Sequence, residues 1–144
     1  MDTYKFVVPI EVRFRDLDSL GHINNSVYFT YCEIARTAYW RKLFSTRRLA
    51  EAGFILAHAE IDYRAQANDE RRLLIGIRAS AFGRTSFEFR YRFEQEETGL
   101  LIAEGRSVQV CFDYKKNGKI AIPESVKQQI IAFEGKENFG GTVG

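Results

Sequence analysis

The sequence is poor in several residue types, and each shortage argues against a class of protein. Its two cysteines, Cys32 and Cys111, stand apart in apolar surroundings, which indicates reduced, buried thiols rather than a disulfide framework. No apolar run approaches the roughly 20 residues that span a bilayer, and the first residues lack the basic and apolar segments of a signal peptide. We therefore expect a cytoplasmic protein that does not interact with membranes.

An excess of charge of one sign is also missing. The chain has 21 Lys and Arg against 19 Asp and Glu, a formal net charge of +2, which is too close to neutral to predict a nucleic-acid partner. It contains no repeat, P-loop or dinucleotide fingerprint. Apolar residues are abundant, at 45%, and 14% of the 144 residues are aromatic. This length and composition predict a single domain with a substantial core.

Hydrophobic periodicity predicts an α+β chain. Alternating apolar and polar residues predict strands over 4–14, 54–64, 73–82, 85–95 and 100–114. Pro9 suggests that the first strand is an edge strand or contains a bulge. Helices are predicted from Ser26 to about Ala52 and from Pro123 onward, and Asn117-Gly118 is a turn signal. We expect one domain over 1–135 and a flexible tail over 136–144.

The first predicted helix is unusually apolar. Its polar residues form one narrow stripe, and nearly all its other positions through Trp40 are apolar or aromatic. A helix with so small a polar face is mostly buried, so we expect the strands to wrap around it.

A group of polar residues lies between the first strand and this helix. It reads Asp16-x-Asp18-x-x-Gly21-His22-x-Asn24-Asn25-x-x-Tyr28. A helix N-terminus offers unpaired N–H groups and a positive dipole, and a nearby carboxylate offers a base or a nucleophile. This pairing suits attack on a carbonyl whose oxygen becomes negative in the transition state.

The same segment resembles the signature of hotdog-fold acyl-CoA thioesterases, most closely the 4-hydroxybenzoyl-CoA thioesterase type. The resemblance is dense over 12–36 and continues more loosely to about residue 123. It implies an antiparallel sheet wrapped around one long central helix, and hydrolysis of an acyl-CoA or acyl-carrier-protein thioester. It also implies a homodimer, or a homotetramer built from two dimers, with a site between subunits. Coenzyme A would enter only as part of the substrate, so no cofactor is predicted.

The resemblance also suggests catalytic roles for three residues. Asp18 matches the aspartate that acts as nucleophile or as general base for water. Asn25 matches the position whose backbone N–H polarises the thioester carbonyl. His22 has two interpretations, a ring hydrogen-bonded within the loop or a group that assists proton transfer near neutral pH.

A second set is predicted to bind substrate, although each member has a plain structural alternative. Asp16 suits a loop hydrogen bond or, through like charge, a raised pKa at Asp18. Gly21 suits a positive φ or close approach of the substrate, Asn24 a helix cap, and Tyr28 core packing. The turn Arg84-Thr85-Ser86 is where related enzymes hold part of coenzyme A, and it is equally an ordinary hairpin turn.

Several alternatives remain open. Glu33, which could pair with Arg36, is a second possible catalytic carboxylate. His58, Glu60 and Asp62 alternate on one strand face, but no further ligand completes a metal set, so no metal is predicted. Rival functions on the same fold are an acyl-thioester hydratase or dehydratase, and a non-catalytic acyl-CoA-binding module. The acyl group itself is not predicted.

Overall fold

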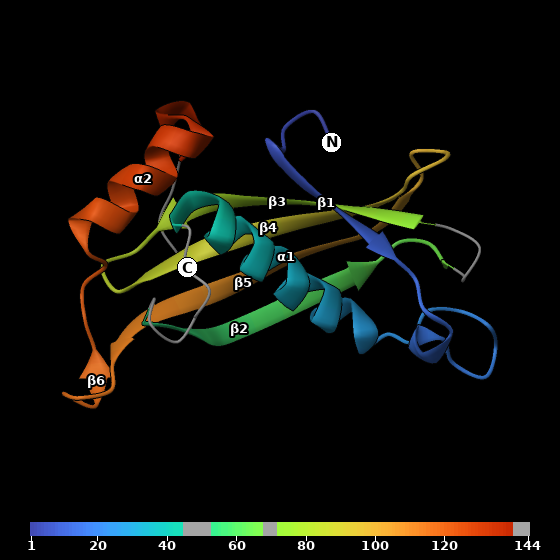
Figure 1. Cartoon of the computed structure of the whole chain (residues 1–144), viewed down its shortest axis with the longest axis horizontal. Helices are drawn as coiled ribbons and strands as arrows, with labels where there is room; N and C mark the ends of the chain where they lie inside the picture. The colour runs from blue at the N-terminus through green and yellow to red at the C-terminus, as the bar shows by residue number, and fades with distance from the viewer. Residues whose placement is uncertain (45–52, 68–71, 140–144) are drawn as a thin grey trace.

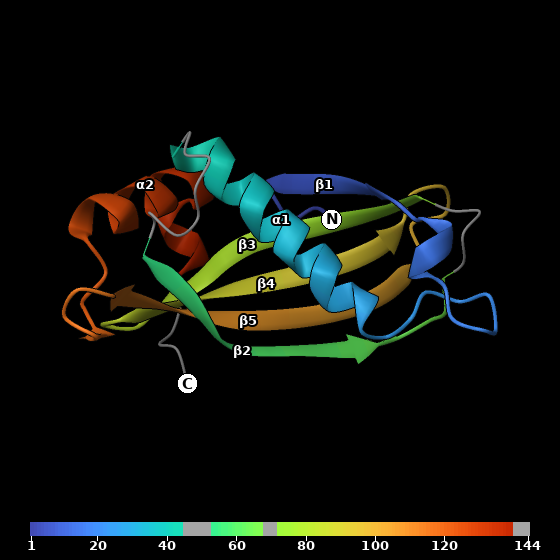
Figure 2. The same cartoon turned by 60° about the horizontal axis from the view of Figure 1, so that its bottom comes forward.

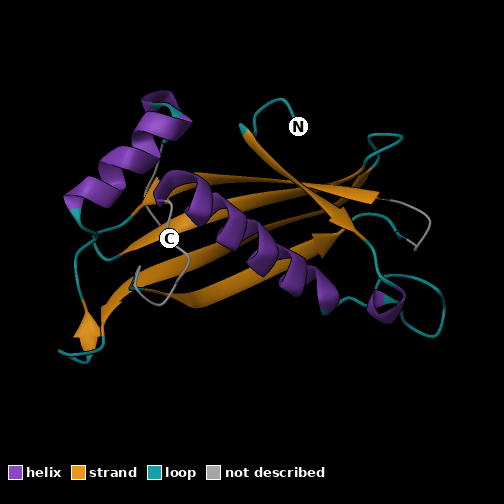
Figure 3. Cartoon of the chain, viewed as in Figure 1, coloured by secondary structure: helices purple, strands orange, loops and turns teal. Residues whose placement is uncertain are grey.

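The protein is built on one antiparallel sheet. The computed structural model describes residues 1–44, 53–67 and 72–139 (Figure 1 and Figure 3). The main elements in chain order are β1 (Phe6–Glu11), α1 (Val27–Phe44), β2 (Phe54–Tyr63), β3 (Arg72–Phe82), β4 (Ser86–Gln95), β5 (Leu101–Asp113), β6 (Gly118–Lys119) and α2 (Glu124–Glu134). The strand order is β1-β3-β4-β5-β2, and the short β6 pairs with β5.

Helix α1 crosses one face of this sheet, and α2 covers one end of it (Figure 1 and Figure 2). The sheet face beneath α1 is lined by alternate residues of neighbouring strands: Ile75 pairs with Phe93, and Ile77 with Tyr91. All four of these side chains are buried. The structure thus confirms the predicted α+β arrangement, with an antiparallel sheet around one long helix.

The helix is less enclosed than its composition predicts. Tyr28, Tyr31 and Tyr39 are buried against the sheet, whereas Phe29 and Ile34 on the other side are 40% and 43% exposed. An open sheet covers only one side of a helix, so the opposite apolar side of α1 is bare in the single chain. The expectation of an almost fully buried helix is therefore wrong for one copy of the chain.

The first strand ends earlier than predicted. β1 ends at Glu11, and Phe14–Asp16 form a 3-10 helix because Asp16 turns back to bind the backbone and side chain of Arg13. β1 is an edge strand, as Pro9 suggested. α1 ends at Phe44, and the rest of its predicted length, residues 45–52, lies outside the described residues.

The predicted flexible tail begins with regular structure. Lys136–Asn138 form a 3-10 helix, and the Phe139 ring stacks on Phe82 with centroids 4.8 Å apart. Aromatic stacking explains this difference, because Phe139 gains an apolar partner that a frayed end would lack. The remainder of the predicted tail, 140–144, is outside the described residues.

The described helices and the two cysteines can be compared with the features expected from the sequence. No described helix has the length and apolar character needed to cross a membrane. Cys32 and Cys111 are free and buried, and burial raises the pKa of the Cys32 thiol to about 12. A thiol in this state is a poor nucleophile, in line with the packing role expected for Cys32.

Candidate active site

The loop between β1 and α1 is closed by its own backbone. Asp18 N–H donates to the His22 carbonyl at 2.7 Å, and Leu17 and Ile23 form an isolated β-bridge. Ile23 N–H donates to the Ala67 carbonyl at 2.9 Å, which fastens the loop to the segment after β2. Gly21 has a φ of +77°, a conformation that favours glycine. Gly21 therefore has the positive φ that was predicted.

Asp18 projects from this loop into a cavity of about 390 Å³, here called the Asp18 cavity. Its exposed carboxylate accepts hydrogen bonds through Oδ1, from the N–H groups of Leu20 (2.9 Å) and His22 (3.2 Å). Oδ2 accepts none from the described residues, so it is available to a substrate or a water molecule. The other predicted residues that line this cavity are His22, Asn25 and Tyr28.

Asp16 faces away from this cavity. It is only 2% exposed, and its carboxylate accepts hydrogen bonds from the Arg13 side chain (3.0 Å) and the Tyr31 hydroxyl (2.8 Å). Burial raises the pKa of Asp16, but these hydrogen bonds outweigh burial and lower it overall. Arg13 and Tyr31 occupy the carboxylate, which fits the loop hydrogen bond that was the structural alternative for Asp16. Asp16 anchors the loop.

His22, Asn24 and Asn25 differ in their hydrogen bonds and in their position relative to the Asp18 cavity. The half-buried His22 ring makes no hydrogen bond with the described residues, so the loop-bonded interpretation of this ring is not supported. Asn24 caps the turn into α1: its Oδ1 accepts the Ser26 N–H at 3.0 Å. Asn24 does not line the Asp18 cavity, whereas Asn25 does, and the Asn25 N–H has no acceptor among the described residues.

A tyrosine that the sequence pattern did not reveal completes the cavity. The Tyr63 hydroxyl, at the end of β2, donates to the Asn25 carbonyl at 2.7 Å. Its ring meets the buried Tyr28 ring edge to face, with centroids 5.1 Å apart. Tyr28 thus both packs in the core and lines the cavity. Residues 64–67, which follow Tyr63, form the rest of the wall.

The turn Arg84-Thr85-Ser86 is far from this cavity within one chain. It connects β3 to β4 at the opposite end of the sheet from the Asp18 loop (Figure 1). β3 has 11 residues, which at about 3.3 Å per residue separates its ends by roughly 33 Å. A single chain therefore does not bring Arg84 to the Asp18 cavity.

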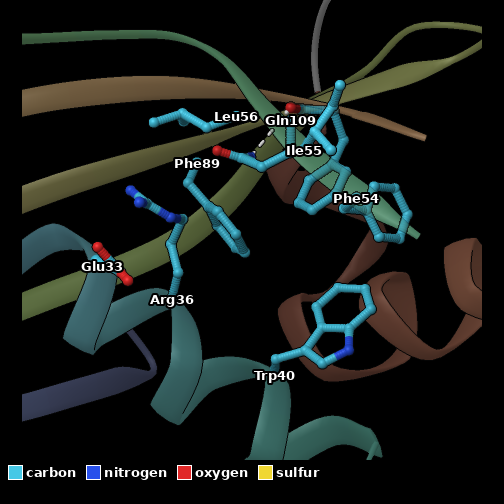
Figure 4. A pocket seen from close by; sticks show the side chains of 9 residues that line it. Glu33, Arg36, Trp40, Phe54, Ile55, Leu56, Phe89 and Gln109 are labelled. Carbon is cyan, nitrogen blue, oxygen red and sulfur yellow. Dashed lines mark hydrogen bonds between the residues drawn. The ribbon is translucent and has the colours of Figure 1, made fainter. Parts of the chain in front are cut away.

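The two other acidic groups singled out in the sequence lie elsewhere. Glu33 borders a second cleft between α1 and β2 (Figure 4). It forms no ion pair with Arg36, which donates instead to the Tyr91 hydroxyl at 3.1 Å. Glu60 on β2 contacts His58 of the same strand and Arg106 of the neighbouring β5. Within the described ranges, no three His, Cys, Asp or Glu side chains are arranged to hold a metal ion.

Comparison with known proteins places the chain in a family. A model of the thioesterase-like superfamily matches residues 12–130, which include the Asp18 loop, α1 and most of the sheet. The chain belongs to this superfamily. The predicted thioesterase family is thereby confirmed.

Individual relatives match over most of this domain. The acyl-CoA thioester hydrolase YbgC of Escherichia coli O6:H1 is 30% identical over 129 residues, 88% of this chain and 96% of that protein. The 1,4-dihydroxy-2-naphthoyl-CoA hydrolase of Synechococcus elongatus is 26% identical over 81% of this chain and 88% of that protein. The uncharacterized protein YsmA of Bacillus subtilis is 30% identical, and the match spans 66% of this chain and 65% of YsmA.

A solved structure shows the same fold. A thioesterase from Thermus thermophilus, complexed with coenzyme A and Zn, superposes with a TM-score of 0.85. It is 32% identical, and the match covers 94% of this chain and 98% of that chain. The hotdog arrangement predicted from the motif of residues 16–28 is therefore confirmed, as is the prediction that the chain is an enzyme of the thioester hydrolase class.

Proposed function

We propose that this protein hydrolyses acyl-CoA thioesters to a free acid and a thiol, with Asp18 as the reacting carboxylate. The observation that carries the proposal is that Asp18 and Asn25 line the same cavity, while Asp18 Oδ2 and the Asn25 N–H have no hydrogen-bond partner among the described residues. Names of relatives support the substrate class: one is an acyl-CoA thioester hydrolase, and a solved thioesterase was complexed with coenzyme A.

The chemistry can follow either of two routes, and both develop a negative charge on the thioester carbonyl oxygen. In one, Asp18 Oδ2 attacks the thioester carbon, and water later cleaves the resulting anhydride. In the other, Asp18 takes a proton from a water molecule that attacks the same carbon. In both, the carbonyl oxygen becomes negative, the C–S bond then breaks, and the thiolate takes up a proton.

The residues around Asp18 support each step. The Asn25 N–H at the start of α1 would stabilise the oxyanion, and one such donor is typically worth about 3–4 kcal/mol of barrier. The unbonded His22 ring is suited to proton transfer to the leaving thiolate. The Asx turn of Asp18, which binds the Leu20 and His22 N–H groups, holds the carboxylate at the cavity.

We also propose that the working unit is a homodimer joined along β2, or a tetramer of two such dimers. β2 lies at the edge of the sheet and pairs only with β5 among the described strands. An antiparallel β2–β2 pair would place the end of one β2, with its Asp18 cavity, beside the start of the other. It would also bring the 84–86 turn of the second copy to the same end of the joined sheet, where Arg84 could meet a coenzyme A phosphate.

The substrate carrier and location are part of the same proposal. An acyl-carrier-protein thioester has the same reacting group and the same pantetheine thiol as acyl-CoA, so both are proposed substrates. The free thiols of Cys32 and Cys111 fit a reducing cytoplasm.

The test is thiol release from short, long and aromatic acyl-CoA thioesters and from acyl-carrier-protein, with the mass of the protein in solution measured in parallel. Turnover by a dimer or tetramer is expected. Water addition to an enoyl-CoA without thiol release would favour a hydratase, and tight binding without turnover would favour a binding module. A monomer with full activity would contradict the proposed dimer.

A further inference from the structure

A second cavity, of about 290 Å³, lies between α1 and the strands and is here called the α1–β2 cleft (Figure 4). Aromatic rings form much of its wall: the centroids of Trp40 and Phe54 are 5.1 Å apart, as are those of Phe54 and Phe87. The cleft borders the same helix and the same strand as the Asp18 cavity. In the proposed dimer, the cleft of one copy lies beside the Asp18 cavity of the other.

A positive charge sits in this largely apolar cleft. The half-buried Arg36 guanidinium extends from α1 toward Leu56 and Gln109 on the far side of the cleft (Figure 4). Its one hydrogen bond within the described chain goes to a neutral group, the Tyr91 hydroxyl. No carboxylate of the described chain is within ion-pair distance of the Arg36 guanidinium. Glu33, which lies one turn earlier on α1, is exposed and does not pair with Arg36. Several N–H donors of Arg36 are therefore unused.

Arg36 is held by a chain of buried hydrogen bonds whose direction can be assigned. Arg36 can only donate, so Tyr91 accepts from it. Ser107 uses its one proton toward Gln109, so in the 2.5 Å bond between Tyr91 and Ser107 the tyrosine hydroxyl is the donor. Ser107 donates to Gln109 Oε1, and Gln109 Nε2 donates to the Phe87 carbonyl at 3.2 Å. Each group uses its proton toward the sheet, which leaves the Tyr91 oxygen free to accept from Arg36.

These hydrogen-bonded polar side chains occupy positions in the protein core. Tyr91, Ser107 and Gln109 are at most 5% exposed, and polar groups there are costly unless every partner is satisfied. Apolar side chains of similar size would fill the same space without that requirement. The arrangement does, however, hold one guanidinium N–H inward, so that the other donors of Arg36 face the cleft.

From these contacts we infer that Arg36 selects acyl groups that carry a carboxylate at the end remote from the thioester. This inference rests on the proposed thioesterase function and names its substrate class. Desolvating a guanidinium in an apolar cleft is favourable only when an anion or a strong acceptor replaces water, and carboxylate is the anion that its planar fork fits best. The aromatic walls would pack against the methylene groups between the thioester and the carboxylate. Tyr91 is the positioning residue for Arg36.

The experiment compares two CoA thioesters of equal carbon number, adipoyl-CoA with a terminal carboxylate and hexanoyl-CoA without one. The wild type is expected to have the higher kcat/KM for adipoyl-CoA. Arg36→Met should lower the adipoyl-to-hexanoyl ratio of kcat/KM by about 10- to 100-fold, the usual effect of losing hydrogen bonds to a charged group. The matched control is Arg41→Met, which removes an exposed arginine of the same helix from outside the cleft and should leave the ratio unchanged.

A second variant tests the positioning role. Tyr91→Phe keeps the ring and removes only the hydroxyl that accepts from Arg36. It should raise the KM for adipoyl-CoA more than the KM for hexanoyl-CoA, by about three- to tenfold, with smaller changes in kcat. A purely structural role would instead change both substrates alike, and thermal melting of each variant checks the fold.

The outcomes separate this inference from the function it rests on. Equal use of the two thioesters, or an equal effect of Arg36→Met on both, would overturn the inference while leaving the thioesterase intact. If neither of these two thioesters nor any other thioester of the panel is hydrolysed, the proposed function fails, and calorimetric binding of adipoyl-CoA and hexanoyl-CoA decides the inference. Preferential binding of adipoyl-CoA that Arg36→Met abolishes would support it, and equal binding would overturn it.

Discussion

The Tyr63 hydroxyl donates a 2.7 Å hydrogen bond to the Asn25 carbonyl and so ties the end of β2 to the turn that leads into α1. This contact joins two walls of the Asp18 cavity. It also holds the backbone of Asn25, the residue whose N–H is the proposed oxyanion donor.

Removing that hydroxyl should affect the reaction more than the fold. Tyr63→Phe keeps the ring contact with Tyr28 and loses one neutral hydrogen bond, worth about 0.5–1.5 kcal/mol. We expect kcat to fall by about three- to tenfold, with little change in melting temperature. Tyr114→Phe, at an exposed tyrosine that lines neither the Asp18 cavity nor the α1–β2 cleft, should leave kcat unchanged. Unchanged turnover in Tyr63→Phe would show that this contact does not organise the site.

Gly21 allows the effect of backbone conformation on the site to be isolated. Gly21 and Gly99 have φ values of +77° and +72°, and a Cβ at either would meet no atom within 4 Å. Alanine at each position should therefore cost a similar amount, about 1–2 kcal/mol of stability, from the left-handed backbone alone. Only Gly21→Ala should also lower kcat, because only Gly21 lies in the Asp18 loop.

This comparison is read from urea unfolding and thiol release of the two variants. Equal losses of stability together with a selective loss of turnover would confirm that the loop conformation matters to the reaction. Equal turnover in both variants would contradict it.

Asp16 predicts a pH dependence of stability. Its pKa is lowered from the ordinary 3.8 because the hydrogen bonds from Arg13 and Tyr31 outweigh the effect of burial. A lowered folded-state pKa contributes stability that is complete above the unfolded value and is lost as the pH falls through the folded value. Asp16→Asn, which removes the charge, should therefore cost roughly 1–3 kcal/mol at pH 7.

The free energy of unfolding in urea, followed from pH 7 downward, checks this. The gap between wild type and Asp16→Asn should narrow as the pH falls below 3.8, since the wild-type carboxyl then takes up its proton. A gap that stays constant with pH would mean that Asp16 acts through packing and not through its charge.

Local sequence patterns predicted the parts of this protein that depend on neighbours along the chain. The alternating apolar residues of β4 and the Asp18-to-Tyr28 motif each lie within one short segment, and both the strand and the loop formed where predicted. The end of β1 was missed because the hydrogen bonds of Asp16 to Arg13, rather than apolar periodicity, turn the chain at that point.

Contacts between distant segments could not be predicted in this way. Tyr63 lies 38 residues from Asn25, and nothing in its own strand pattern distinguishes it from other β tyrosines. The chain from Arg36 to Tyr91 and Ser107 likewise joins three elements whose packing the sequence does not specify. The exposure of Phe29 and Ile34 on α1 could not be predicted for the same reason, because periodicity identifies apolar residues but not the elements that cover them.

Asp18→Asn shows most directly whether the Asp18 carboxylate performs the chemistry. Asn keeps the side-chain oxygen that accepts the Leu20 and His22 N–H groups, but it can neither attack nor take up a proton. Asp113→Asn is the matched control, because Asp113 Oδ1 also accepts backbone N–H groups, from Lys115 and Lys116, and Asp113 lines neither the Asp18 cavity nor the α1–β2 cleft. Thiol release should fall by about 10²-fold or more in Asp18→Asn and stay unchanged in Asp113→Asn. Turnover by Asp18→Asn at the wild-type rate would contradict the account.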